Sequence, residues 1–334
     1  MPKQTMQAVC PSTSGGPEVL KISDVAIPVP TAQQLLIKVH ATALNRADIL
    51  QREGKYPPPL GESNIPGLEI AGEVIICGAQ ASGFKSGQRV FGLVGSGGYA
   101  EYCLLDHRMA MPMPDHWEYG QAAAVPEVFF TASETLFELG QLQSGEKILI
   151  HAGGSGVGTA AIQMAHHVGA QVYITAGSAA KIEKTQALGA KAGINYKTED
   201  YAQEILRLTA GEGVDVVEDF IGQDYFARNL AILKPEGRLI QVAVMSGRQV
   251  SLDLSILMMK RLQIKGFILR SRSLEQKREI TQRFSKRWVP LLISAKIKPI
   301  IDSVFPLAMI QEAHRYLQSN QHFGKVIISM DEYV

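Results

Sequence analysis

The chain has 334 residues, about twice the length of a typical domain, so two domains are expected. Its 33 Lys and Arg against 32 Asp and Glu give a formal net charge of +1, which argues against a nucleic-acid footprint or an acidic tail. The three cysteines (Cys10, Cys77 and Cys103) are too widely spaced for a disulfide framework or a compact metal cluster, which favours a reducing compartment. Residues 1–6 lack an apolar signal segment and no apolar run reaches about 18 residues, so we expect a soluble, cytoplasmic protein.

The first 120 residues or so alternate short apolar runs with turns rich in Gly and Pro. The runs at 35–39, 73–77, 89–93 and 99–105 have the length and composition of strands. Clusters such as Tyr56-Pro57-Pro58-Pro59 interrupt them. This part of the chain therefore predicts a β-rich, irregular domain.

From about residue 126 strands and helices alternate. Strands are predicted at 147–152, 171–175, 192–195, 214–220, 238–243 and 262–268, and helices at 157–168, 179–188, 199–209 and 225–233. Gly189 and Pro235 are expected to stop two of these helices. A long polar helix at 273–294 and a strand at 325–329 follow. The series predicts a parallel sheet with helices on both faces and a ligand site beyond the carboxyl ends of the strands.

A glycine-rich turn, His151-Ala-Gly-Gly-Ser-Gly-Val-Gly158, joins the predicted strand 147–152 to the helix that follows. Glycines permit a tight turn and close backbone approach, and a helix N-terminus attracts phosphate. Compared with the dinucleotide fingerprint, the turn reads Gly153-x-Ser155-x-x-Gly158, with serine at the middle glycine. The strand–turn–helix context favours dinucleotide binding over a merely structural turn.

The next strand ends in Thr175-Ala-Gly-Ser178, without the acid that an NAD site places on the ribose. Ser178 can cap a helix that carries Lys181 and Lys184 in its first turns. A helix N-terminus with a lysine suits a 2′-phosphate, so NADP(H) is favoured over NAD(H). The alternative is a solvated helix face with two ordinary lysines.

Motifs shared with a known family extend over nearly the whole chain. They include Gly15-Gly-Pro-Glu18, Ala43-Leu-Asn-Arg-Ala-Asp48, Pro66-Gly-Leu-Glu69, Gly98-Tyr-Ala-Glu-Tyr102, Pro126-Glu127, Leu269-Arg-Ser-Arg272 and Phe323-Gly-Lys325. The chain resembles the zinc-independent quinone oxidoreductases of the medium-chain dehydrogenase/reductase superfamily, most of all the tumour-suppressor-induced, zeta-crystallin-like subgroup.

That resemblance implies an α/β fold of two domains. A GroES-like β-rich catalytic domain would comprise residues 1–125 and 295–334, and a Rossmann doubly wound parallel-sheet domain would comprise 126–294. It also implies a homodimer. If a dimer forms, we expect the mixed apolar segment 252–267 to be an interface.

Zinc is not expected. Alcohol dehydrogenases of this superfamily have a cysteine near residues 45–47 and a histidine in the motif written here Pro66-Gly-Leu-Glu69. This chain has Asn45, Arg46 and Leu68 at those places, and no cluster of cysteines. Without a Lewis acid, alcohol oxidation becomes improbable.

The resemblance also implies a set of NADP(H) contacts. Asn45 and Thr131 would lie beside the nicotinamide, Ser155, Gly156 and Val157 at the pyrophosphate, and Gly177, Ser178, Lys181 and Tyr196 at the adenosine phosphate. Further contacts would be Phe220, Ile221, Val244, Met245, Ser246, Phe267, Ile268, Leu269 and Asn320.

Hydride transfer to a quinone requires a cofactor beside an apolar pocket and a proton source for the oxygen. Tyr56, in Gly54-Lys-Tyr-Pro57, is the candidate donor; the alternative is an exposed loop tyrosine. His151 is expected to be structural.

Three functions stay open at this point. The first is NADPH-dependent reduction of a quinone or related conjugated carbonyl, a small-molecule substrate. The second is reduction of 2-enoyl thioesters, for which Arg46, Arg52, Arg270 and Arg272 could receive phosphates. The third is a non-catalytic NADPH-binding role like that of zeta-crystallins, which the net charge of +1 does not support as RNA binding.

Overall fold

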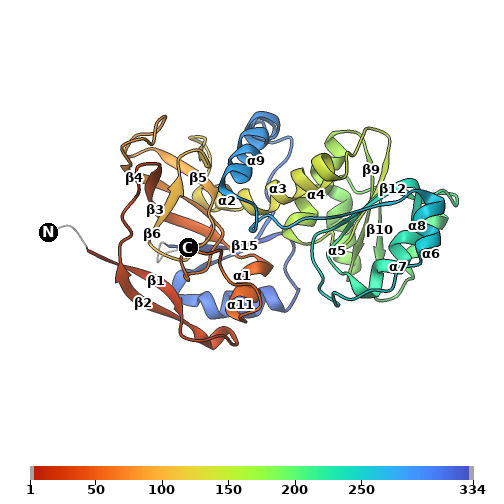
Figure 1. Cartoon of the computed structure of the whole chain (residues 1–334), viewed down its shortest axis with the longest axis horizontal. Helices are drawn as coiled ribbons and strands as arrows, with labels where there is room; N and C mark the ends of the chain where they lie inside the picture. Colours follow the sequence, from red (N-terminus) through yellow and green to blue (C-terminus); the bar gives the residue numbers. More distant parts are fainter. Residues whose placement is uncertain (1–3, 331–334) are drawn as a thin grey trace. The chain divides into compact units, whose positions relative to one another are not determined.

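The computed structural model describes residues 4–330 (Figure 1). It divides into two compact units, which we call unit 1 (Met1–Phe130 and Arg270–Val334) and unit 2 (Thr131–Leu269). The second division lies earlier in the chain than residues 294 and 295, where the sequence placed it. Helix α9 (Leu274–Arg287) therefore groups with unit 1.

Unit 2 is built on a six-stranded parallel sheet. Its strands are β8 (Lys147–Ile150), β9 (Gln171–Ala176), β10 (Ala192–Asn195), β11 (Val214–Asp219), β12 (Leu233–Gln241) and β13 (Gln263–Gly266). They lie in the order β10-β9-β8-β11-β12-β13, and every neighbouring pair is parallel. This is the Rossmann order, in which the chain starts in the middle and proceeds to each edge in turn.

Helices cover both faces of this sheet. They are α4 (Gly156–His167), α5 (Ala179–Ala187), α6 (Tyr201–Leu208), α7 (Gln223–Ile232) and α8 (Leu254–Lys260). Figure 1 shows α4 and α5 on one side of the strands and α6, α7 and α8 on the other. Leu149, Tyr173 and Ile205 belong to a core cluster that joins strands to helices. In residues 4–330, no helix is both long and apolar enough to cross a membrane.

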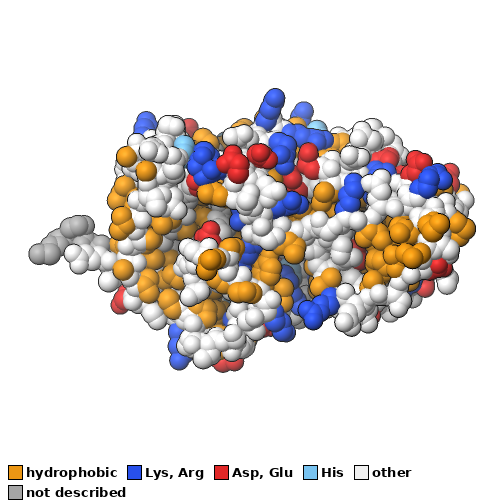
Figure 2. All heavy atoms as spheres, in the orientation of Figure 1, with side chains coloured by type: hydrophobic (Ala, Val, Ile, Leu, Met, Phe, Trp, Pro, Cys, Tyr) orange, Lys and Arg blue, Asp and Glu red, His pale blue; other side chains and the backbone are white. Residues whose placement is uncertain are grey.

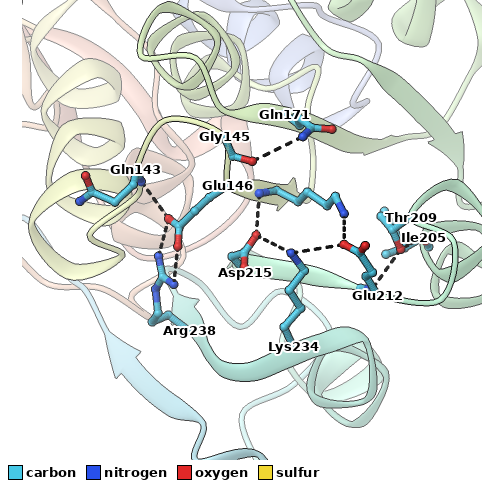
Figure 3. Close-up of polar contacts among 12 residues, drawn as sticks. Gln143, Gly145, Glu146, Gln171, Ile205, Thr209, Glu212, Asp215, Lys234 and Arg238 are labelled. Atoms are coloured by element: carbon cyan, nitrogen blue, oxygen red, sulfur yellow. Dashed lines mark hydrogen bonds and ion pairs between the residues drawn. The ribbon is translucent and has the colours of Figure 1, made fainter.

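Ion pairs join the amino ends of the strands in unit 2 (Figure 3). Arg238 forms a two-pronged pair with Glu146, with N–O distances of 2.9 and 2.7 Å. One carboxylate oxygen of Asp215 accepts the backbone N–H of Lys147 at 2.7 Å and the Lys234 ammonium at 3.1 Å. These charges have partners and stabilise this end of the sheet. Parallel sheets of this kind bind ligands beyond the opposite, carboxyl ends of their strands.

Unit 1 is β-rich and mostly antiparallel. Its larger sheet has the order β14-β15-β3-β4-β5-β7, with β6 also paired to β3, and β1 and β2 form a separate hairpin. The strands are β1 (Thr5–Pro11), β2 (Leu20–Ala26), β3 (Gln34–Ala43), β4 (Glu69–Cys77), β5 (Arg89–Leu93), β6 (Tyr102–Asp106), β7 (Ala110–Pro112), β14 (Ile301–Pro306) and β15 (Lys325–Ser329). Because β15 pairs with β3, the end of the chain completes a sheet that its beginning started.

In the described part of unit 1, five α-helices accompany the sheet: α1 (Arg46–Arg52), α2 (Tyr119–Ala123), α9, α10 (Val289–Ile293) and α11 (Ile310–Gln318). Helix α3 (Pro126–Ser133) contains the boundary with unit 2. A core cluster that includes Val9, Ile49, Ile310 and Ile328 joins the hairpin, α1, α11 and β15. The predicted fold class, an α/β chain with a GroES-like β-rich part and a doubly wound parallel sheet, is confirmed.

The single helix predicted at 273–294 is two helices, α9 and α10 (Val289–Ile293). Pro290 lies in the first turn of α10, and proline has no N–H with which to continue the hydrogen bonds of α9. Trp288, at the junction, is buried, so packing holds the break in place.

The role predicted for Pro235 is also corrected. Helix α7 ends at Ile232, and Pro235 lies inside β12 instead of stopping a helix. The β11–β12 pairing shifts register in this region, and Glu236 adopts a positive φ of 66°. A proline is tolerated in a strand at such an irregularity because no ladder hydrogen bond is required of it.

Candidate functional site

The glycine turn after β8 forms a cradle at the N-terminus of α4. The Ser155 hydroxyl accepts the Gly158 N–H at 3.0 Å and caps the helix. A Cβ on Gly158 would lie 2.5 Å from the Ala152 carbonyl oxygen, and one on Gly153 would lie 2.8 Å from the Ile174 Cβ. Neither glycine can be replaced without moving the backbone, and Ser155, Gly156 and Val157 present the helix N-terminus that a pyrophosphate requires.

Residues after β9 and β10 come together at the same end of the sheet, beyond the carboxyl ends of the strands. The Ser178 hydroxyl accepts the Lys181 N–H at 3.3 Å and caps α5. A Cβ on Gly177 would lie 2.7 Å from the Tyr196 hydroxyl and 3.3 Å from the Lys197 Cε. Sequence reasoning missed Lys197, although its place beside Tyr196 at the end of a neighbouring strand was a usable signal.

The loops after β11 and β12 are linked to each other. The Met245 N–H donates to the Phe220 carbonyl at 3.2 Å, and the Ser246 hydroxyl donates to the Ile221 carbonyl at 3.0 Å. Val244 is next to this link, and Phe267, Ile268 and Leu269 follow β13. The expected unit 2 contacts after β8 to β13 thus all lie beyond the carboxyl ends of the strands. The cradle, the capped helices and the lysines fit a phosphorylated dinucleotide.

Four expected site residues lie elsewhere in the chain. Thr131 is on α3, at the start of unit 2. Asn45, Tyr56 and Asn320 belong to unit 1, where Asn45 precedes α1, Tyr56 is in the loop after α1, and Asn320 follows α11.

His151 is structural, as expected. It is fully buried, its Nδ1 lies 3.0 Å from the Thr175 hydroxyl, and its Nε2 lies 2.9 Å from Asn229 Oδ1. Desolvation lowers the pKa of the imidazole to about 4, so the ring is neutral at physiological pH. It ties the end of β8 to β9 and α7.

Asn45 in unit 1 is locked into a buried network. Its Nδ2 donates to Glu69 Oε1 at 2.8 Å, and its Oδ1 accepts the Lys325 ammonium at 2.7 Å. The same ammonium donates to Glu69 Oε1 and to the Leu44 carbonyl, each at 2.8 Å. Asp48 holds the backbone by accepting the Asn45 N–H at 2.8 Å. The amide of Asn45 is therefore oriented by charges, and a lone pair of its Oδ1 is what it can still offer a ligand.

Tyr56 is held by a buried arginine. The Arg270 guanidinium lies over the Tyr56 ring, 5.2 Å from its centroid, and donates to the Tyr56 carbonyl at 3.2 Å. It also donates to the Gly95 carbonyl at 3.2 Å and to Gln51 Oε1 at 2.6 Å. Burial above all, and then the charge of Glu127, raise the pKa of the Tyr56 phenol to about 12, against the opposing effect of Arg270. The phenol therefore stays protonated and can act as a donor.

Glu127 interacts with residues of both groups. Its backbone N–H donates to Glu69 Oε2 at 2.8 Å. Desolvation, followed by repulsion from Glu69, raises the pKa of its carboxyl to about 8. At neutral pH this acid is thus mostly protonated. Where Glu127 is ionised, its charge adds to the effect of burial and raises the pKa of Tyr56 further.

Sequence reasoning did not single out Glu69, Glu127 or Lys325, although all three lie in motifs that carry the family resemblance. Arg270 was considered only as a contact for phosphates. The missing information was spatial, because the partners of each residue are far away in the sequence.

In the described part of the chain, no three His, Cys, Asp or Glu side chains gather in a way that could hold a metal ion. Two of the positions at which a zinc site would need a cysteine or a histidine hold Asn45 and Leu68. The side chain of Asn45 is hydrogen-bonded to Glu69, and Leu68 is buried. All three cysteines are unbridged.

Comparison with known proteins identifies the family. Residues 31–115 match the family described as "Alcohol dehydrogenase GroES-like domain", and residues 156–286 match "Zinc-binding dehydrogenase". The "Quinone oxidoreductase" of Homo sapiens is 32% identical over 329 residues, 98% of each chain.

Solved structures agree. The Escherichia coli quinone oxidoreductase, complexed with NADPH, has a TM-score of 0.87 and 29% identity, covering 97% of this chain and 99% of its own. The CurK enoyl reductase has a TM-score of 0.87 and 31% identity, covering 98% and 100%. The chain therefore belongs to the medium-chain dehydrogenase/reductase superfamily and has quinone oxidoreductases among its relatives.

Proposed function

We propose that this protein is a zinc-independent, NADPH-dependent oxidoreductase that reduces a quinone or a related conjugated carbonyl compound. The observation that carries the proposal is a protonated, pinned phenol, Tyr56, in a chain that also has a glycine cradle for a dinucleotide. Bound NADPH supplies a hydride. Ser155, Gly156 and Val157 would hold its pyrophosphate, and Ser178, Lys181, Tyr196 and Lys197 would hold the adenosine phosphate. The other predicted contacts, Asn320 included, would complete the site.

The chain's own part in the reaction is to orient the acceptor and deliver a proton. As negative charge develops on the acceptor oxygen, the Tyr56 phenol donates its proton there, which completes the uptake of one hydride and one proton. Arg270 keeps the ring in place and stabilises the phenolate that remains. Solvent then returns the proton. No nucleophile and no metal ion is required for this sequence of events.

A second candidate function is reduction of a 2-enoyl thioester, and the likeness to the CurK enoyl reductase favours it. A phosphate-bearing thioester needs accessible cations, yet two of the arginines suggested for that role are committed. Arg270 is buried with the contacts described above, and Arg52 is buried against Gly15 and His314. We therefore place the quinone first, and a non-catalytic NADPH-binding role third.

The test is oxidation of NADPH by the purified protein with ortho- and para-quinones and, in parallel, with crotonyl-CoA. We expect quinone turnover, and a loss in kcat of about 100-fold in Tyr56→Phe, since general acid catalysis contributes 10²–10⁴-fold. Tyr102→Phe, a half-buried tyrosine of the same unit, serves as control. Turnover of crotonyl-CoA alone would establish the protein as a 2-enoyl thioester reductase. Tight NADPH binding without turnover of either substrate would establish the non-catalytic role.

Cofactor choice is tested separately. Lys181→Ala and Lys197→Ala should each weaken NADPH binding about tenfold and leave NADH binding unchanged, since a 2′-phosphate contact is lost. Lys191→Ala, whose ammonium is bound to Gln171 instead, is the control. Equal losses for both cofactors would contradict the assignment.

We also propose a homodimer in the cytoplasm. Leu254, Met258 and Met259 of α8 are 61%, 73% and 72% exposed, and β13 is an edge strand. Figure 2 shows hydrophobic side chains gathered on the visible face of unit 2 near α8. Exposed edges and apolar patches of this kind are where copies of a chain join. Light scattering should give the dimer mass for the wild type and the monomer mass for Met258→Asp/Met259→Asp.

A further inference from the structure

Unit 1 contains a cavity that none of the assigned roles uses. Its volume is about 360 Å³, and segments from the hairpin, from the loops after α1 and β5, from β6 and from α9 line it. Most of its wall is apolar and includes Met6, Val25, Leu93, Val94, Leu105 and Met109. Its described lining contains neither Tyr56 nor Asn45, although Gly95 is common to this wall and to the contacts of Arg270.

One side chain in that wall, Lys277, has no hydrogen-bond partner in the described part of the chain. Lys277 of α9 is only 6% exposed, and among residues 4–330 its ammonium has no hydrogen-bond acceptor. Desolvation lowers the pKa of this ammonium, with Glu62 the largest opposing influence. The Nζ atom is not fully enclosed, so the ammonium opens into the cavity, where it can pair with an anion.

The acidic residues near Lys277 do not supply an acceptor for its ammonium. Asp106 also lines the cavity, but its two oxygens are bound by Arg278 at 2.7 Å and Arg108 at 3.1 Å. Glu62 belongs to an exposed loop and makes no hydrogen bond to Lys277. The more distant Glu127 and Arg270 act on it only through their charges, in opposite directions. The ammonium therefore faces an apolar cavity as its only uncommitted cation.

We propose that this cavity is a second binding site, for a small apolar carboxylic acid whose carboxylate pairs with Lys277. The apolar wall receives the hydrocarbon body, for example an aromatic ring, and the single cation fixes the orientation of the acid. A carboxylate supplies the acceptor that the fold does not. Glu62 acts as a competing counter-ion at the mouth of the site. The site does not depend on the proposed reductase function, because neither the cofactor cradle nor Tyr56 belongs to it.

Calorimetric titration of the full chain with benzoate, without cofactor, tests the proposal. Benzamide, which has the same shape but no charge, is the matched ligand. We expect benzoate to bind at least tenfold more tightly than benzamide. Lys277→Gln should abolish that preference, Lys277→Arg should keep it, and Glu62→Gln should strengthen benzoate binding because a competing carboxylate is removed.

Lys286→Met is the matched control variant, since it removes an exposed lysine of the same helix. It should bind benzoate as the wild type does. Melting curves followed by circular dichroism establish that each variant is folded. Equal binding of benzoate and benzamide, failure of benzoate to bind at millimolar concentration, or unchanged binding in folded Lys277→Gln would each overturn the proposal. The titration measures binding without cofactor or quinone. Its outcome therefore does not depend on whether the protein has the proposed reductase activity.

Discussion

Two buried lysines of unit 1, Lys325 and Lys277, have opposite surroundings. Lys325 is 3% exposed and donates to Leu44, Asn45 and Glu69 at 2.7–2.8 Å, so each of its three N–H groups has an acceptor. Lys277 is 6% exposed and has none within the described chain. Two lysines at a similar depth thus differ in their contacts: Lys325 is part of a complete hydrogen-bond network, whereas Lys277 has no acceptor among the described residues.

The difference teaches how to separate structural charges from functional ones. A buried charge whose hydrogen bonds are all made contributes to the fold, and removing it leaves the opposite charge buried without a partner. A buried charge without partners costs stability, so the fold loses little when it is removed. Stability measurements therefore distinguish the two kinds before any ligand is known.

The largest effect is expected at Lys325. Lys325→Met leaves the Glu69 carboxylate buried without its cation and should lower the free energy of unfolding by about 3–5 kcal/mol. Lys277→Met should change it by less than about 1 kcal/mol, because no hydrogen bond is lost. Urea denaturation of both variants measures this, and equal losses would show that the two lysines do not differ as described.

An intermediate effect is expected at Glu218 of β11. Thr135 donates to Glu218 Oε1 at 2.6 Å, the other oxygen has no partner, and desolvation raises the pKa to about 8. The folded protein therefore keeps a proton that the unfolded chain releases above about pH 4.3, so stability falls as pH rises from there to 8.

Glu218→Gln should reduce that decline by about 1 kcal/mol per pH unit. Denaturation midpoints at pH 5, 6, 7 and 8 measure it, with Glu279→Gln, an exposed glutamate, as control. An unchanged slope in Glu218→Gln would mean that this carboxyl is ionised in the folded protein.

A smaller effect is expected at Arg238, whose pair with Glu146 is complete but less deeply buried (13% and 23% exposed). Arg238→Met should cost about 1–2 kcal/mol and leave NADPH affinity unchanged, since it lies at the amino ends of the strands. Arg261→Met, in a pair that is 63% and 72% exposed, should cost less than about 0.5 kcal/mol. Weakened NADPH binding in Arg238→Met would contradict the separation of the two sheet edges.

Much of unit 2 was predictable because its signals are local. The strand at 192–195 has the predicted bounds, and Ser178 caps a helix as expected. Unit 1 was less predictable. The hairpin of β1 and β2 was not foreseen, since short runs interrupted by turns carry weak periodicity. Helix α11 was not foreseen either, although its buried residues Ile310, Ala313, His314 and Leu317 recur at helical spacing.

By itself, then, the sequence determined the order of strands and helices in unit 2, the glycine cradle, and the family to which the chain is similar, because glycine geometry, caps and apolar periodicity act over a few residues. Only the tertiary structure decided which charges meet. Lys325 lies 256 residues from Glu69, and Arg270 lies 214 residues from Tyr56. The tertiary structure also leaves Lys277 without an acceptor among residues 4–330. Pairing at such separations depends on how strands align, and no local pattern encodes it.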